Sequence, residues 1–219
     1  VTFFESSKIN VDIQQVSQDT YLKTHKLTSP LITSETVLNS KIIFEASNEN
    51  LDLNLFTEVY EDLSKESSDR YEYIFPSYNL TRYLESSLQG ELSFSSSGSN
   101  KLYDTNVHQK TMANDLNYSS LKNITTGGFI TNYELLLKNF NSDNKNSKSS
   151  KNELDQNLQS IIKYQIQYPL KKEGVKFDSV LTPILSARFS PNKSRDIKGS
   201  DRIIEYNNIF SLNRIGSGE

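Results

Sequence analysis

Short segments in which apolar and polar residues alternate place the strongest constraint on the fold of this chain. In the clearest of them, residues 51–60, Leu53 and Leu55 fall on one face of an extended chain. Asp52 and Asn54 fall on the opposite face. A period of two is typical of a β-strand with one face in an apolar medium and one in water. The same alternation recurs in four further segments, 9–13, 88–94, 158–168 and 175–189. The sequence therefore predicts an all-β protein, either a sandwich or a barrel.

Composition narrows the class of protein. The 219 residues are long enough for one large β domain or two small ones. No apolar run reaches about 18 residues, which excludes a transmembrane helix, whereas barrel strands hide their apolar residues at alternate positions. The net charge of −3 argues against general nucleic-acid binding, which needs a basic face. The absence of cysteine excludes disulfides, thiolate metal sites and cysteine nucleophiles.

The two ends of the sequence predict a piece of a longer protein. Val1 is not a start methionine, and no signal peptide precedes the first expected strand. Residues 213–219 end the sequence without a terminal strand signature. We therefore expect an internal segment.

The alternation and the turn residues predict nine or ten strands, each near the length that crosses a bilayer when tilted. Pro76 is expected at a strand end or bulge, because it cannot donate to a ladder. Residues 17–25 predict a helical turn capped by Ser17 or Asp19. The expected strands are 8–16, 41–46 and 51–60 (a hairpin), 71–76, 82–95, 107–119, 129–137, and 158–168 with 175–189 (a second hairpin).

The expected connections are rich in Ser, Asn, Gly and charged residues. Gly127-Gly128 predicts a turn or bulge. Residues 141–152 are too polar to bury anything, so we expect a mobile exposed loop there. Loops are also predicted at 64–70, 96–101 and 169–174.

Nothing in the sequence indicates an enzyme or a cofactor. His25 and His108 are far apart, lack metal-ligand spacing, and are interpreted as solvated or loop residues. Asp104 and Asp115 are interpreted as a turn residue and a strand-start residue, and no carboxylates stand out as an acid/base pair. The pattern alone leaves an outer-membrane barrel and a soluble β-sandwich both open.

Four segments resemble a known family in the correct order between residues 16 and 216. Residues 16–22 (VSQDTYL), 71–76 (YEYIFP), 181–183 (LTP) with 188–191 (RFSP), and 208–216 (NIFSLNRIG) are similar to segments of the LPS-assembly proteins, the LptD family, also called organic solvent tolerance proteins. Gln18 stands where that family commonly has an acid, and the sequence stops before the Asp-Arg pair that usually follows. The matching residues are Ser17, Asp19, Tyr21, Leu22, Tyr73, Pro76, Pro183, Pro191, Phe210, Arg214 and Gly216.

This resemblance implies an antiparallel outer-membrane β-barrel in a Gram-negative cell. Members of the family receive lipopolysaccharide from a periplasmic bridge of LptA/LptC-like proteins. They release it sideways into the outer leaflet through a gate between the first and last strands. An LptE-type lipoprotein plug sits inside the barrel. Residues 1–219 would then be part of a single transmembrane β-barrel domain, lacking the N-terminal periplasmic domain and the C-terminal strands.

The resemblance also implies a role for each face of the strands, with lipopolysaccharide, the plug, the bridge proteins and outer-membrane lipids as partners and no nucleic acid. Asp52, Asn54, Gln159, Lys163, Gln165 and Gln167 would face a wet lumen. Leu51, Leu53, Leu55, Ile162, Tyr164 and Ile166 would face lipid acyl chains. The alternatives are another outer-membrane barrel, such as a porin or transporter, and a soluble secreted β-sandwich adhesin.

Overall fold

The structure is a computed structural model that describes residues 4–26, 34–66, 69–104, 106–148, 152–174, 177–191 and 212. Its elements are β1 (Ser6–Asp12), α1 (Tyr21–His25), β2 (Val37–Asn48), β3 (Leu51–Asp62), β4 (Tyr71–Leu84), β5 (Gly90–Tyr103), β6 (Val107–Ser120), β7 (Asn123–Ile124), β8 (Ile130–Lys145), β9 (Leu154–Gln167), β10 (Leu170–Lys172), β11 (Ser179–Leu181) and β12 (Ile184–Phe189).

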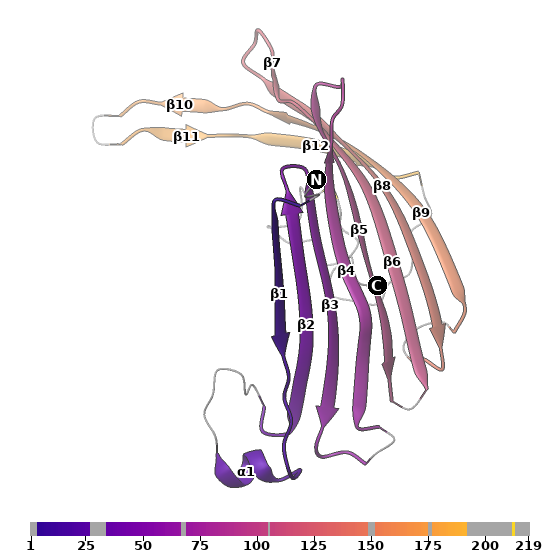
Figure 1. Ribbon diagram of the computed structural model, residues 1–219. Coiled ribbons are helices and arrows are strands. Elements are labelled where there is room, and N and C mark those ends of the chain that lie inside the picture. The colour runs from indigo at the N-terminus through magenta and orange to yellow at the C-terminus, as the bar shows by residue number, and fades with distance from the viewer. Residues whose placement is uncertain are drawn as a thin grey trace. The chain divides into compact units, whose positions relative to one another are not determined.

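Ten of the strands form one antiparallel sheet (Figure 1). Its order is β1-β2-β3-β4-β5-β6-β8-β9-β12, with β7 paired to β8, and β10 and β11 form a separate ribbon. The predicted all-β class and strand number are therefore confirmed. In the described part of the chain β1 and β12 are not paired, so the sheet is not closed into a barrel. No helix among the described residues is long and apolar enough to span a membrane.

The chain divides into two compact units, each of which is described by itself below. Unit 1 comprises Val1–Arg82, Ser95–Asn114 and Phe140–Gln156. Unit 2 comprises Tyr83–Phe94, Asp115–Asn139 and Asn157–Glu219.

In unit 1 the hairpin of β2 and β3 pairs with β1 on one side and with β4 on the other. Its strands pair from Val37↔Asp62 to Asn48↔Leu51, which leaves only Glu49 and Asn50 in the turn. The predicted hairpin is thus confirmed and is longer than expected at both ends. Pro76 lies where the β3–β4 register shifts, so its predicted position at a bulge is also confirmed.

Two predicted loops belong to strands. Residues 96–101 lie within β5, and residues 141–145 complete β8. In β8, Ser142 is 8% exposed, so the expectation of an exposed loop over 141–152 is wrong for this part. Beyond β8, the Ser147 N–H donates a hydrogen bond of 2.6 Å to Asn152 Oδ1. Asn152 Nδ2 in turn donates one of 3.0 Å to the Ser147 carbonyl oxygen. Strands do not need apolar residues to form a backbone ladder, which explains both errors.

Three smaller predictions need correction. The helical turn begins at Tyr21 after Thr20, and neither Ser17 nor Asp19 caps it. Asp115 lies in the middle of β6 and not at a strand start. The hairpin of 158–168 with 175–189 forms through β9 and β12, but its connection contains the β10–β11 ribbon. Asp104 and Gly127-Gly128 lie in turns, as predicted.

β1 ends at Asp12, earlier than expected. Beyond it the chain contacts β2 through side-chain hydrogen bonds and not through backbone pairing. The side-chain oxygen of Gln14 accepts a hydrogen bond of 3.0 Å from the Asn39 N–H. The Gln14 N–H in turn donates to Ser40 Oγ at 3.0 Å. Leu22 of α1 then packs with Leu38 and Leu63 into a small buried cluster. Side-chain bonds therefore replace the ladder at this end of β2.

Candidate functional site

The register of β1 to β4 separates two faces in unit 1. Ile9 is opposite Phe44, and Phe44 is opposite Leu55. Leu55 is in turn opposite Tyr78. Since directly opposed residues share a face, these side chains define one surface, which we call the apolar face. Its members are Ile9, Val11, Leu38, Ile42, Phe44, Ala46, Leu53, Leu55, Val59, Tyr71, Tyr73, Phe75, Tyr78 and Leu80.

Much of this apolar face is exposed, although Leu38 and Ala46 are buried. Ile9 is 65% exposed, Val11 59% and Phe75 66%. Tyr71 and Tyr73 are also exposed, and their rings stack with centroids 6.0 Å apart. Soluble proteins seldom leave a contiguous apolar surface of this kind uncovered, so its presence indicates an interaction surface.

The opposite surface of unit 1, which we call the polar face, carries the alternate residues. Four apolar side chains, Val37, Ile43, Phe56 and Ile74, also lie there. A hollow of about 380 Å³ lies on this face, and its polar lining residues are Ser6, Lys8, Glu45, Ser47, Asp52, Asn54, Asn79 and Thr81. The predicted separation of Leu51, Leu53 and Leu55 from Asp52 and Asn54 is confirmed by the register.

Unit 2 shows an inverted pattern of burial. In β8, Lys138 is 3% exposed, whereas Leu137 beside it is 47% exposed. In β9, Lys163 is 6% exposed and Ile162 is 49% exposed. The covered side carries these lysines beside Leu136 and Ile161, which are 1% and 2% exposed, while large apolar side chains are open on the other side. An ordinary soluble sheet seldom buries lysines while it leaves large apolar side chains exposed.

Two ion pairs cross the strands on the covered side of unit 2. Lys138 Nζ lies 2.7 Å from Asp115 Oδ2, which joins β8 to β6. Lys163 Nζ lies 3.1 Å from Glu134 Oε1, which joins β9 to β8. The β9–β12 register also places Arg188 opposite Lys163, on this same side. Ionic groups therefore line the covered side across four strands.

Several buried acceptors have no hydrogen-bond donor in the described part of the chain. In unit 2 these are Asp115 Oδ1, Asn132 Oδ1 and Gln159 Oε1. In unit 1, Asn54 Oδ1 on the polar face is a further example. Buried polar atoms are normally satisfied by protein or by water, so these surfaces suit a wet environment or a ligand that donates hydrogen bonds.

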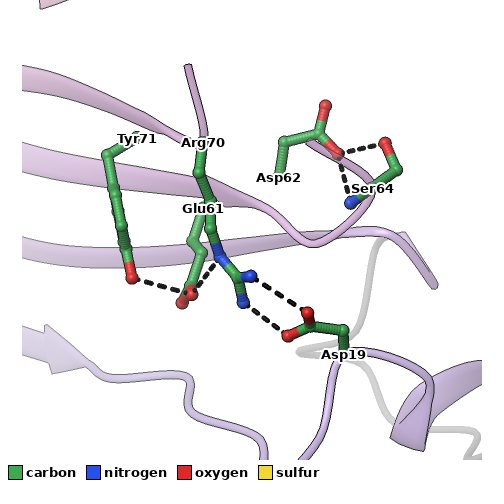
Figure 2. A network of polar contacts seen from close by, with 6 residues as sticks. All are labelled: Asp19, Glu61, Asp62, Ser64, Arg70 and Tyr71. Atoms are coloured by element: carbon green, nitrogen blue, oxygen red, sulfur yellow. Dashed lines mark hydrogen bonds and ion pairs between the residues drawn. The ribbon is translucent and has the colours of Figure 1, made fainter. Parts of the chain in front are cut away.

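A polar network fixes the β1–β2 connection to the end of the sheet in unit 1, as Figure 2 shows. Arg70 donates two hydrogen bonds to Asp19, at 2.6 and 3.0 Å, and a third to Glu61 at 2.8 Å. The Tyr71 hydroxyl donates to the same Glu61 oxygen at 2.9 Å. We call the set of Asp19, Glu61 and Arg70 the clasp. It joins the connection after β1 to strand β3.

The clasp predicts a pH dependence. The hydrogen bonds from Arg70 hold the pKa of Asp19 below its usual value of 3.8. Because the folded-state pKa is depressed, the stabilisation is present above the unfolded-state pKa and is lost as pH falls through the lower folded value. We therefore expect residues 13–26 to resist proteolysis at neutral pH and to become cleavable only below about pH 4. Limited proteolysis by pepsin and by a neutral protease across this range would measure it. Asp19→Asn should remove the dependence, and opening near pH 6 would contradict it.

The residues that carry the family resemblance are dispersed in the structure. Asp19 belongs to the clasp, Leu22 is buried beneath α1, and Tyr73 lies on the apolar face. The others are placed as follows: Ser17 is exposed before α1, the Tyr21 ring is tilted against that of His25, Pro76 is in the β4 bulge, the Pro183 carbonyl accepts a hydrogen bond from Tyr168 N–H, and Pro191 follows β12. Phe210, Arg214 and Gly216 lie outside the described residues.

The sequence singles out Asp19, Asp115 and Lys163 but not the residues that pair with them, which are Arg70, Lys138 and Glu134. The sequence predicts only a charged loop around Arg70, which meets Asp19 across a separation that no local pattern reveals. Lys138 and Glu134 are four residues apart in β8, so they share a face of the strand, and the exposed apolar residues such as Leu137 lie on the other face. This alternation is the sequence signal that could have identified the two charged residues. Among the described residues no three His, Cys, Asp or Glu side chains are grouped to hold a metal ion.

No protein-family model matches the chain, and no curated protein matches it with significant similarity.

Proposed function

We propose that this chain is part of the wall of an outer-membrane β-barrel that moves lipopolysaccharide into the outer leaflet, as proteins of the LptD family do. The observation that carries the proposal is the inverted burial, in which covered lysines alternate with exposed apolar residues. Barrel strands in an outer membrane have this arrangement, apolar toward lipid and polar toward the lumen.

The length of the apolar face agrees with a bilayer. On β3 it is bounded by Leu51, opposite Arg82, and by Glu61, opposite Tyr71. At about 3.4 Å per residue this stretch is about 34 Å long. A strand tilted by about 45° would then project about 24 Å onto the membrane normal, near the apolar band of about 25 Å in such barrels. Polar or charged residues therefore begin where the lipid would end.

The polar side suits lipopolysaccharide, which is rich in sugar hydroxyls. The hollow on the polar face of unit 1 is lined by amides, carboxylates and hydroxyls that bind such groups. Unpartnered acceptors such as Asn54 Oδ1 and Gln159 Oε1 would accept hydrogen bonds from them. The choice of lipopolysaccharide over other cargoes rests on the four resembling segments. In this role the chain performs no chemistry and needs no cofactor, and an LptE-type plug and the periplasmic bridge would be its protein partners.

Single cysteines at positions 52, 53, 54 and 55 test the membrane wall in the full-length protein within outer-membrane vesicles. This stretch has no cysteine of its own. Leu53→Cys and Leu55→Cys are expected to be shielded by lipid from a charged thiol reagent, whereas Asp52→Cys and Asn54→Cys are expected to be labelled. Each substitution is the control for its neighbour, because all four lie in one strand.

The possible outcomes separate the alternatives. Uniform labelling, or a protein found only in the soluble fraction, would overturn the proposal in favour of a secreted β-sandwich. A photo-reactive residue at Asn54 then distinguishes a translocon from a porin. A lipopolysaccharide adduct is expected there in growing cells, and its absence alongside alternating cysteine protection would leave another kind of outer-membrane barrel.

A further inference from the structure

Residues 13–26, which we call the foot, follow β1 and include α1, which lies beyond one end of β1 and β2 (Figure 1). Leu22 of the foot packs with Leu38 and Leu63. Leu38 is opposite Glu61 and belongs to the apolar face. The clasp then fixes Asp19 to Glu61 through Arg70 (Figure 2). The foot therefore covers Leu38, at the end of the apolar face.

The outward side of the foot is aromatic and basic. Tyr21 is 37% exposed, and its ring centroid lies 4.5 Å from that of His25. Lys23 and Lys26 are exposed as well, and α1 has no acidic residue in its first turn. Within the described part of the chain neither lysine forms an ion pair, and the nearby acid, Asp19, is held by Arg70. The foot therefore presents uncompensated positive charge next to an aromatic ring.

The lengths of the connections indicate which side of the membrane the foot occupies. The connection from β1 to β2 runs from Ile13 to Thr36 and is the longest between strands that are neighbours in the sheet. At the other strand ends, β2 and β3 are joined by Glu49 and Asn50 alone, and β9 and β12 are joined by 168–183, which includes the β10–β11 ribbon. Outer-membrane barrels have short periplasmic turns and longer extracellular loops. The foot would accordingly lie at the outer surface, where the leaflet carries the phosphate groups of lipopolysaccharide.

We propose that the foot is a membrane-surface contact, with Lys23 and Lys26 against the phosphates of lipopolysaccharide already resident in the outer leaflet and Tyr21 at the level of the head groups. This inference rests on the proposed function, because it requires the apolar face to be covered by lipid. It assigns the partner by charge, since clustered lysines at a membrane surface bind anionic head groups. It also assigns a role to the clasp, which holds the foot at the boundary of the bilayer.

A photo-reactive residue at Lys23 of the full-length protein in living cells tests the contact, with adducts identified by immunoblotting and mass spectrometry. A lipopolysaccharide adduct is expected at position 23. This adduct should persist when the periplasmic bridge is depleted, because lipopolysaccharide already in the outer leaflet remains there. A lipopolysaccharide adduct at Asn54 should instead disappear, because no new lipopolysaccharide is delivered. With the photo-reactive residue moved to Thr24, Lys23→Gln and Lys26→Gln are each expected to lower the yield about fivefold. Arginine at both positions should restore it. Lys122→Gln, at an exposed lysine in the connection after β6, should leave the yield unchanged and is the matched control.

The other outcomes are distinct. Adducts with phospholipid alone at position 23 would place the foot on the periplasmic side and overturn the inference. The absence of any lipid adduct at position 23, with lipid adducts at Leu55, would overturn the inference and leave the membrane wall intact. The absence of lipid adducts at both positions would mean that the proposed function itself has failed.

Discussion

Lys138→Met is expected to lower the free energy of unfolding by about 3 kcal/mol or more, since breaking a buried ion pair from one side costs about 3–5 kcal/mol. The Lys138 side chain is 3% exposed and that of Asp115 is 17% exposed. One Asp115 oxygen already lacks a partner, and the substitution would remove the partner of the other. Methionine retains the length of the lysine stem, so the lost charge and not a cavity would be responsible.

The double variant Lys138→Met with Asp115→Leu separates charge from packing. Replacing both members of a buried pair by apolar groups is often neutral or stabilising, so most of the lost stability should return. Urea unfolding of the full-length protein refolded in detergent would measure all three variants. Lys171→Met is the control, because the Lys171 side chain is 53% exposed and its pairs with Glu173 and Asp178 are open to solvent. A single variant no less stable than this control would show that the Lys138 pair is solvated.

Gly90→Ala is expected to destabilise the protein by about 3 kcal/mol, at the upper end of overpacking effects. A Cβ at this position would overlap the Ser119 carbonyl oxygen and lie 2.8 Å from Tyr118 Oη. The carbonyl is part of β6, which is hydrogen-bonded to β5, so it cannot move aside without loss of strand pairing. The Tyr118 hydroxyl is itself fixed by a hydrogen bond of 3.0 Å to the Gln89 carbonyl.

Gly127→Ala is the matched control for this steric effect. Its Cβ would meet the Phe129 side chain at 3.4 Å, an ordinary contact distance. We expect almost no change in the unfolding transition for this variant. Equal destabilisation by both substitutions would mean that backbone freedom of the glycines, and not the overlap at Gly90, determines the result.

The sequence predicts the strands best where one face of the sheet is apolar. The alternation from Leu51 to Leu55 gives both the existence of β3 and the separation of its faces, because a period of two leaves no other assignment. The alternation does not predict the strand at 96–101, because the structural role of Gly98 there cannot be recognised from the neighbouring sequence. The Tyr78 ring lies so close to Gly98 that a Cβ there would be 2.7 Å from it. A polar, glycine-containing stretch was therefore read as a loop although it continues β5.

The ion pairs could not be predicted for a different reason. Whether Lys138 meets Asp115 depends on the register between strands and on how many residues each connection takes up. The alternation shows which residues of β8 share a face with Lys138. A shift of one residue in the strand register would nevertheless place Lys138 on the other face of the sheet. The clasp is harder still, since Arg70 meets Asp19 only after a connection without regular strands folds back onto the sheet end.

The short β1 edge has a consequence for handling the isolated polypeptide. The Gln14 side chain already occupies the Asn39 N–H of β2, so the end of the sheet near the foot does not offer a backbone edge to another chain. Within the described residues no strand pairs with the outer edge of β1 from Ser6 to Asp12, and the apolar Ile9 and Val11 on this strand are exposed. An uncovered strand edge is a template for self-association. Purified in water without neighbouring strands or detergent, the chain is expected to aggregate through β1. Charged residues in place of Ile9 and Val11 would therefore be the first change to make in a soluble version.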